Sequence, residues 1–323
     1  MKKIFALLLT VLMVVALTAC NTEGGNTNDD GKFVVGVVQL APHVALDAAT
    51  QGFIDALKEE LGEENVEVKV EIAAGDTATC APIVSSFVSE NVDLIMANAT
   101  PALQAAVAAT TDIPILGTSV TEYGVALDIK NFSGTVGGNI SGTSDLAPLD
   151  KQAEMIKEWF PEAKTVGLLY CSAEANSQYQ VDEVQKYLEG LGFTCKQYPF
   201  ADSNEMQSIT QKAASESDVI YVPTDNTVAN ATGIIDGICR PAKVPVITGE
   251  EGICSGCGVA TLSINYYDLG VTTGKMAAKI LKGESNISEM AVQYSETFTA
   301  KYNKEICDEL GLTVPEGYVE IEK

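Results

Sequence analysis

The chain has 323 residues, of which 46% are hydrophobic and 20% are charged, and acidic residues outnumber basic ones by 44 to 20. The net charge of −24 would repel a phosphate backbone or an anionic lipid surface, which excludes nucleic acid as a partner. The single histidine, His43, excludes a histidine-pair metal site, and the length suits two lobes better than one compact core.

The N-terminal segment has the pattern of an export signal. Two lysines precede a run over residues 4–16 that is apolar except for Thr10 and is too short to be a permanent membrane helix. The run leads into LTAC at residues 17–20, which resembles a bacterial lipobox, where the cysteine thiol is lipidated. We predict a signal peptide over residues 1–19 and a flexible tether over residues 20–32 with a lipid anchor at Cys20, on the outer face of the cytoplasmic membrane. An ordinary secretory signal is the alternative.

Strands and helices alternate after the tether. Residues 33–38 form a continuous apolar run of the length of a buried parallel strand, and apolar residues then recur at helical spacing over residues 45–57. Residues 66–72 alternate as in a strand with one wet face, and residues 93–97 and 113–116 are short buried strands. The first half is therefore predicted to be α/β with a parallel sheet.

The second half repeats the strand pattern of the first. The matched segments are residues 35–38 with 166–169, 113–116 with 244–247, and 93–96 with 218–221. The first two pairs are 131 residues apart and the third is 125 apart, a difference that a shortened loop absorbs. We predict two related, Rossmann-like lobes, with a later helix over residues 267–281 that has Gly270 and Gly274 on its contact face.

Polar residues follow the predicted strands, at the edge of the sheet where ligands of open parallel sheets bind. This rim comprises Gln39, His43, Asn98, Thr100, Thr118, Ser119, Thr121, Ser172, Asn176, Thr224, Asp225, Asn226, Glu250 and Glu251. Two lobes that present such rims to each other would form a cleft. Many of these residue types also serve as turn and cap residues of their own backbone, so the rim alone does not assign ligand contacts.

The rim offers partners for both charges of a zwitterion. Thr100 followed by Pro101 predicts a helix N-terminus, whose free N–H groups could hold a carboxylate. On the other lobe, Asp225 and Glu250 could hold an ammonium group, although Asp225 also fits a helix N-cap. Of the neighbours Glu250 and Glu251, we expect at most one to face the ligand.

Taken together, the motifs resemble the ABC-transporter substrate-binding lipoproteins whose studied members bind tryptophan, tyrosine or phenylalanine. The resemblance spans about residues 34–312 and rests on QLAPHVALD (39–47), ATPA (99–102), GTSDL (142–146), PTDNT (223–227), GEEG (249–252) and YYDLG (266–270). It implies a type I periplasmic-binding fold that delivers its ligand to a membrane permease. It also adds Ser144, Asp145 and Tyr266 to the candidate ligand-binding residues.

The resemblance implies two lobes joined by a hinge that the chain crosses more than once. We expect the N-terminal lobe to comprise residues 33–144 and 266–284, and the C-terminal lobe residues 145–265 and 285–323. The expected protein is a monomer without enzymatic activity, cofactor or metal. Its expected partners are an amino acid, which is aromatic by the resemblance, and the permease subunits of an ABC importer.

The cysteines support a rival interpretation. Seven remain apart from Cys20, so they cannot all pair within the chain. A structural disulfide among Cys239, Cys254 and Cys257, free thiols and a metal site all remain open, and CSGC at residues 254–257 resembles a redox or half-zinc motif. The alternatives are a thiol-redox or metal-binding lipoprotein and a binding protein for a nucleoside or a sugar.

Overall fold

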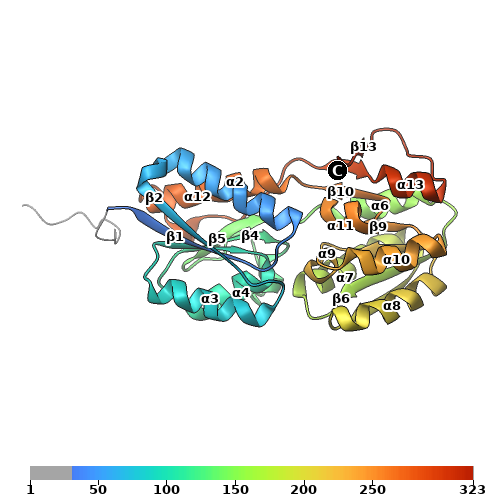
Figure 1. The fold of residues 1–323 in the computed structure, drawn as a ribbon, viewed down its shortest axis with the longest axis horizontal. Helices are drawn as coiled ribbons and strands as arrows, with labels where there is room; N and C mark the ends of the chain where they lie inside the picture. Colours follow the sequence, from blue (N-terminus) through green and yellow to red (C-terminus); the bar gives the residue numbers. More distant parts are fainter. Residues whose placement is uncertain (1–30, 323) are drawn as a thin grey trace, which may run out of the picture.

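The computed structural model describes residues 31–322 and shows two lobes side by side (Figure 1). The predicted signal peptide and the predicted anchor at Cys20 lie outside these residues. Within the described range, no helix is both long enough and apolar enough to cross a membrane. Each lobe has a mainly parallel sheet with helices on both faces, so the predicted α/β class is confirmed.

The first lobe is built on a six-stranded parallel sheet in the order β11-β5-β4-β3-β1-β2. Its strands are β1 (Phe33–Gln39), β2 (Val66–Ile72), β3 (Leu94–Asn98), β4 (Ile115–Val120), β5 (Ile140–Ser144) and β11 (Gln293–Tyr294). Its helices are α2 (Val44–Leu61), α3 (Thr77–Ser89), α4 (Thr100–Ala109), α5 (Tyr123–Ala126) and α12 (Tyr266–Leu281). Helices α2 and α12 cover one face of the sheet, and α3 and α4 cover the other (Figure 1).

Strand β1 shows why this sheet is buried on both sides. Val35 and Val37 pack in the core beneath α2 and α12, whereas Val34 and Val38 pack in the core on the side of α3 and α4. Because successive side chains of a strand point to opposite faces, a continuous apolar run serves both cores. The carboxyl end of this strand points toward the second lobe (Figure 1).

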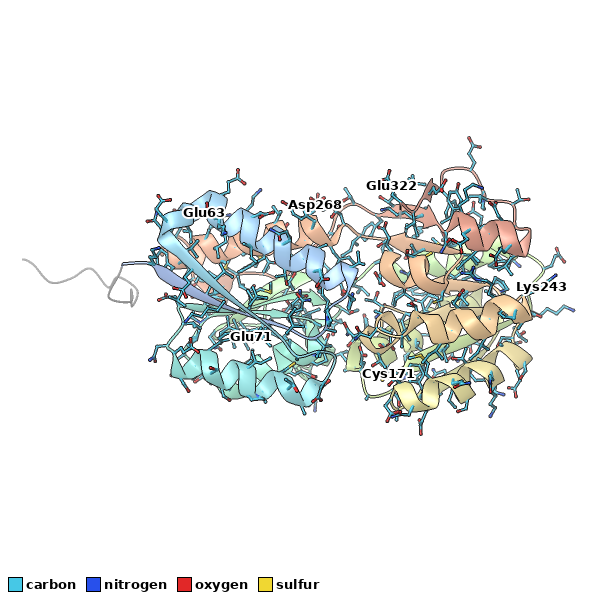
Figure 2. All side chains as sticks on the ribbon, viewed as in Figure 1. Glu63, Glu71, Cys171, Lys243, Asp268 and Glu322 are labelled. Atoms are coloured by element: carbon cyan, nitrogen blue, oxygen red, sulfur yellow. The ribbon has the colours of Figure 1, made fainter. Side chains whose placement is uncertain are left out.

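The second lobe has a seven-stranded sheet in the order β13-β12-β10-β9-β8-β6-β7, in which only the β10–β12 pair is antiparallel. Its strands are β6 (Thr165–Cys171), β7 (Thr194–Phe200), β8 (Val219–Val222), β9 (Val246–Thr248), β10 (Ala260–Ser263), β12 (Thr299–Tyr302) and β13 (Val319–Glu320). Its helices are α6 (Leu149–Trp159), α7 (Ala175–Gly190), α8 (Ser203–Glu216), α9 (Asn226–Ala229), α10 (Thr232–Ala242), α11 (Glu251–Cys257) and α13 (Lys304–Leu310). Exposed charged side chains such as Glu63, Asp268 and Lys243 surround both lobes (Figure 2).

The chain crosses between the lobes after β5, after β10 and after β11. The predicted boundary at residue 284 is wrong, because β11 pairs with β5 in the first sheet and Ile287 packs in the core of the first lobe. Residues 285–294 therefore belong to the first lobe. This strand has no recognisable sequence pattern, because β11 has two residues and both are exposed.

Helices α2 and α12 contact each other through glycines. A Cβ atom on Gly270 would lie 2.0 Å from the carbonyl oxygen of Ala49, and one on Gly274 would lie 2.6 Å from that of Phe53. Because the neighbouring atoms belong to the backbone, no side chain can move aside to make room for an added Cβ atom. The predicted contact face of this helix, with Gly270 and Gly274, is confirmed.

We expect Gly270→Ala to lower the free energy of unfolding by about 2 to 3 kcal/mol, because the added methyl group forces α2 and α12 apart. Gly233→Ala is the matched control, since Gly233 also lies in a helix and a Cβ there would meet nothing within 4 Å. That variant should gain about 0.5 to 1 kcal/mol from helix propensity. Chemical denaturation measures both, and equal effects would contradict the packing argument.

Candidate functional site

A small cavity lies between the lobes, at the carboxyl ends of strands from both sheets. We call it the interlobe cavity, and it is lined by His43, Leu46, Ser119, Thr121, Asp145, Asn176, Thr224, Asp225, Asn226, Ala229, Glu250, Ile253 and Tyr266. Its free volume is about 10 Å³, so the lobes are closed upon each other. This is the place where open parallel sheets bind their ligands.

Eight of the thirteen residues predicted to bind ligand line this cavity. They are His43, Asp145, Asn176, Thr224, Asp225, Asn226, Glu250 and Tyr266. The apolar lining residues Leu46, Ala229 and Ile253 were not predicted. Each of them lies three residues after a predicted polar one, so helical spacing from His43 and from its counterparts on α9 and α11 could have identified them.

Three predicted residues instead bond within their own lobe. The Gln39 side-chain amide donates to the carbonyl oxygen of Ala41 and to Asp47 Oδ1, both at 2.7 Å. The Thr118 hydroxyl lies 3.0 Å from that of Thr143, and Ser144 Oγ donates to the carbonyl oxygen of Thr121 at 2.7 Å. The prediction that Gln39, Thr118 and Ser144 face the ligand is not supported, because they order the strand ends that carry the lining residues.

The predicted carboxylate site at Thr100 and Pro101 is also unsupported. Ala99, with φ of 96°, is the N-cap of α4, and both predicted residues are buried within the helix and do not line the cavity. Helix α2, in contrast, does begin at the cavity. Its N-cap is His43, which makes no side-chain cap bond in the described structure, so the first N–H groups of α2 lack a capping side chain.

Three carboxyl groups meet at the cavity with no lysine or arginine among its described lining residues. Asp145, Asp225 and Glu250 are each at most 4% exposed. Burial raises the pKa of Asp225 to about 7, helped by the charge of Glu174, and burial raises that of Glu250 to about 7. Burial also raises the pKa of Asp145. The cavity is therefore suited to a cation, which would favour the ionised form of these groups.

The three carboxyl groups differ in the hydrogen bonds that their oxygens already accept. Asp225 accepts from the backbone N–H of Cys171 (labelled in Figure 2) at 2.7 Å and from that of Val228 at 2.9 Å. Glu250 accepts from the backbone N–H groups of Gly252 and Ile253 at the start of α11. Both acids are thus helix caps as well as cavity residues. Asp145 differs, because its second oxygen has no hydrogen-bond partner among residues 31–322.

Four buried polar atoms at the cavity have no hydrogen-bond partner within residues 31–322. They are His43 Nε2, Ser119 Oγ, Asp145 Oδ1 and Asn176 Oδ1. Tyr266 donates to the other oxygen of Asp145 at 3.0 Å. Burial lowers the pKa of His43, so its ring is neutral near pH 7. An unsatisfied buried polar atom costs about 1 to 3 kcal/mol, so four around one cavity indicate a site that bonds a polar ligand.

The cysteines form no bridge in the structure. All seven cysteines within the described residues are free, so the possible disulfide among Cys239, Cys254 and Cys257 is not present in the structure. Burial raises the pKa of Cys239 to about 12 and raises those of Cys254 and Cys257 as well, which disfavours the reactive thiolate. No group of residues in the described chain has the composition of a metal site.

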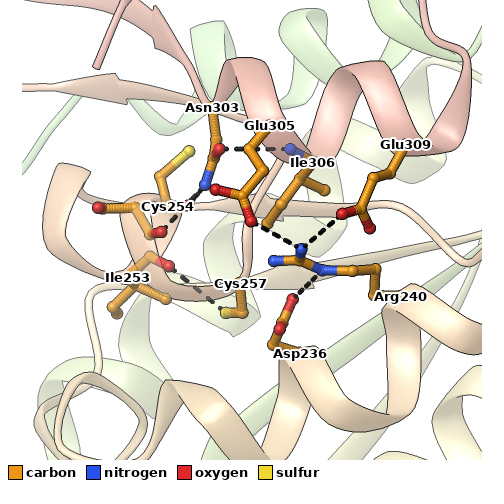
Figure 3. A network of polar contacts seen from close by, with 10 residues as sticks. Asp236, Arg240, Ile253, Cys254, Cys257, Asn303, Glu305, Ile306 and Glu309 are labelled. Carbon is orange, nitrogen blue, oxygen red and sulfur yellow. Dashed lines mark hydrogen bonds and ion pairs between the residues drawn. The ribbon is translucent and has the colours of Figure 1, made fainter. Parts of the chain in front are cut away.

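Hydrogen bonds involve the Cys254–Cys257 segment and its neighbours (Figure 3). The Asn303 side-chain amide donates to the carbonyl oxygen of Cys254 at 3.1 Å, and the Cys257 thiol donates to that of Ile253 at 3.4 Å. Beside them, Arg240 bonds Asp236 at 2.8 Å. The Asn303 bond connects α11 to the start of α13, and the redox interpretation finds no support in this geometry.

Comparison with known proteins gives consistent matches over nearly the whole described chain. Residues 34–321 match the family described as ABC transporter substrate binding protein. A tyrosine-binding protein of Clostridioides difficile (strain R20291) is 36% identical over 295 residues, which cover 88% of this chain and 85% of that protein. The structure of an ABC domain in complex with L-Trp from Streptococcus pneumonia has a TM-score of 0.85 at 33% identity, and covers 90% of this chain and 100% of that one.

A third comparison bears on the arrangement of the lobes. The ligand-free, open structure of a substrate binding protein with adhesive properties from Clostridium difficile is 38% identical, with coverage of 90% of this chain and 100% of that one, yet its TM-score is 0.69. The greater likeness to the L-Trp complex, despite lower identity, agrees with closed lobes around the small cavity. The predicted type I periplasmic-binding fold is confirmed. The chain belongs to the ABC transporter substrate-binding protein family.

Proposed function

We propose that this protein is the extracytoplasmic receptor of an ABC importer for an aromatic L-amino acid, which it binds in the interlobe cavity. The observation that carries the proposal is the set of four unpartnered polar atoms around one acidic cavity. The relatives named for tyrosine and L-Trp support the aromatic class. A nucleoside or a sugar fits less well, because neither needs buried carboxyl groups to balance a positive charge.

The two charges of an α-amino acid have separate partners in this proposal. The ammonium group would bond the free oxygen of Asp145, within the negative potential of Asp225 and Glu250. The carboxylate would take the hydroxyl of Ser119 and the uncapped start of α2. The side chain would then lie against Leu46, Ala229, Ile253 and Tyr266, which supply the apolar part of the lining.

Binding in this proposal requires the lobes to separate and close again. A free volume of about 10 Å³ holds one water molecule and no amino acid, so the ligand must enter an open form. Lining residues come from both lobes, and the three chain crossings form the hinge. Closure therefore makes contacts that the open form lacks, and the permease can distinguish the two states.

Isothermal titration calorimetry of the purified protein against the twenty amino acids, a nucleoside panel and a sugar panel tests this proposal. An aromatic amino acid has about 12 to 15 heavy atoms, and about 0.6 kcal/mol per atom gives a Kd near or below micromolar. We expect such binding for one or more of tyrosine, tryptophan and phenylalanine. Binding of a nucleoside or a sugar with no response to any amino acid would overturn the proposal.

We also propose that the receptor is a monomer tied to the membrane through Cys20. The lipobox-like sequence at residues 17–20 and the polar tether support this proposal. A receptor held close to its permease would deliver its ligand efficiently. Cys20→Ala should move the protein from the membrane fraction to the soluble fraction, and retention on the membrane would contradict the anchor.

A further inference from the structure

Glu174 is a buried acid beside the interlobe cavity that is not one of its lining residues. It is 6% exposed and lies immediately before α7, in the loop that follows β6. Its position brings its negative charge near Asp225 and, across the cleft, near His43. Glu174 bonds no lysine or arginine within the part of the chain that the structure describes, so its buried carboxylate needs other hydrogen-bond donors.

Both carboxylate oxygens of Glu174 accept from the chain segment that follows Asp225. Oε1 accepts from the backbone N–H of Thr227 at 2.8 Å and from its hydroxyl at 2.7 Å. Oε2 accepts from the backbone N–H of Asn226 at 3.1 Å and from its side-chain amide at 2.7 Å. It also accepts from the side-chain amide of Asn176 at 3.2 Å. Two of these donors, Asn176 and Asn226, belong to residues that line the cavity.

This arrangement caps one short helix with two carboxylates. The first N–H groups of α9 have no partners within the helix. Asp225 accepts from Val228, and Glu174, which comes from a different part of the chain, accepts from Asn226 and Thr227. Hydrogen bonds to an ionised acceptor are about twice as strong as neutral ones, so Glu174 fixes the conformation of this turn.

We propose that Glu174 is a positioning residue for ligand binding, which holds Asn176, Asn226 and the Asp225–Thr227 turn in the arrangement that faces the ligand. The role rests on the proposed function, since it acts on residues assigned to the ligand. The titratable groups that face this cluster are Asp225 and Cys171 on its own lobe and His43 from α2. Glu174 therefore also contributes to the electrostatic potential in which a bound ammonium group lies.

The first test needs no ligand. Glu174→Gln keeps the size of the side chain but presents an amide donor where one carboxylate oxygen accepted. We expect hydrogen exchange of the peptide over residues 223–231 to become at least about tenfold faster in this variant, because one of the two backbone N–H groups loses its acceptor and the bond to the other is no longer charge-assisted. The control is Glu189→Gln on α7, where Glu189 is exposed and accepts from Gln185. Unchanged exchange in Glu174→Gln would overturn the proposal.

The second test measures binding of L-tyrosine as a function of pH. We expect Glu174→Gln to weaken binding by about tenfold and to move the pH midpoint of binding lower, because burial raises the pKa of Asp225 and the charge of Glu174, which raises it further, is gone. Glu174→Asp keeps the charge, so its midpoint should stay near that of the wild type. A merely structural role would lower the melting temperature and leave the midpoint in place, which would overturn the proposal.

The two tests separate this inference from the proposed function. If the unmodified protein binds no amino acid, the proposed function fails, and exchange at residues 223–231 still decides whether Glu174 holds the turn. If the unmodified protein binds L-tyrosine and Glu174→Gln binds it with the same affinity and midpoint, the positioning role alone fails.

Discussion

Replacing Asp145 by asparagine is expected to weaken the binding of L-tyrosine by about 100-fold. Asp145 Oδ1 is buried without a partner, whereas the oxygens of Asp225 and Glu250 already accept backbone hydrogen bonds. Loss of a buried charged partner typically costs about 2 to 5 kcal/mol of binding free energy, and 100-fold corresponds to about 2.7 kcal/mol. The asparagine has the same shape, so calorimetry would measure the loss of charge and not of packing.

The same substitution should not destabilise the fold at pH 7. Burial raises the pKa of Asp145, which means that its ionised form is unfavourable in the folded state. A neutral amide removes that penalty, so the melting temperature should stay level or rise. Asp128→Asn is the matched control, because Asp128 is exposed, and asparagine tolerates its φ of 52°. Equal affinity of Asp145→Asn and Asp128→Asn would refute the role of Asp145.

The place of the site was predictable because strand direction fixes it. Residues that follow buried parallel strands must lie at one edge of the sheet, and His43, Asn176 and Glu250 do so. The apolar runs that indicate the strands are local in sequence, so the rim follows from them directly. The expectation that at most one of two adjacent acids faces the ligand stays a prediction, and in the structure Glu250 lines the cavity while Glu251 bonds Lys301 at 2.6 Å.

The use of each rim side chain was not predictable, because it depends on contacts between distant segments. Thr118 bonds Thr143 and Thr273, which come from a neighbouring strand and from a helix 155 residues away. Ser119 is free to face the cavity because β4 and β5 shift register beside it and its φ is 52°. Neither this register shift nor the return of the chain to the first lobe at α12 leaves a local signal in the sequence.

Glu174 shows the same limit for charged residues. Its sequence neighbours resemble those of any solvated loop acid, and its importance comes from donors more than fifty residues away. Burial of four carboxyl groups near one cavity is therefore a property of the fold and not of a motif. It also makes the stability of the folded protein depend on pH.

The free protein should lose stability as pH rises from about 4 to about 7. Asp225 and Glu250 have folded pKa values of about 7, above the values near 4 of unfolded chains, so the folded state binds more protons in this window. Each group therefore stabilises the fold in its protonated form, and this stability disappears once pH exceeds the folded pKa. His43 acts in the opposite direction below about pH 6.5, since burial lowers its pKa, but it is one group against two.

Affinity for an amino acid should follow the opposite trend and rise with pH over the same range. An ammonium ligand favours ionised carboxylates, so binding at pH 6 to 7 should release protons, and the Kd at pH 5.5 should exceed that at pH 7.5 by about tenfold or more. Titration calorimetry in buffers of different ionisation enthalpy measures how many protons are released on binding.

Thermal melts of the free protein in low and high salt test the stability trend. Salt screens the exposed part of the net charge of −24 and leaves buried groups almost unaffected, so the melts in high salt report on the buried carboxyl groups. Proton uptake on binding, or a melting temperature that rises from pH 5 to 7.5 in high salt, would show that these carboxyl groups do not meet the ligand's positive charge.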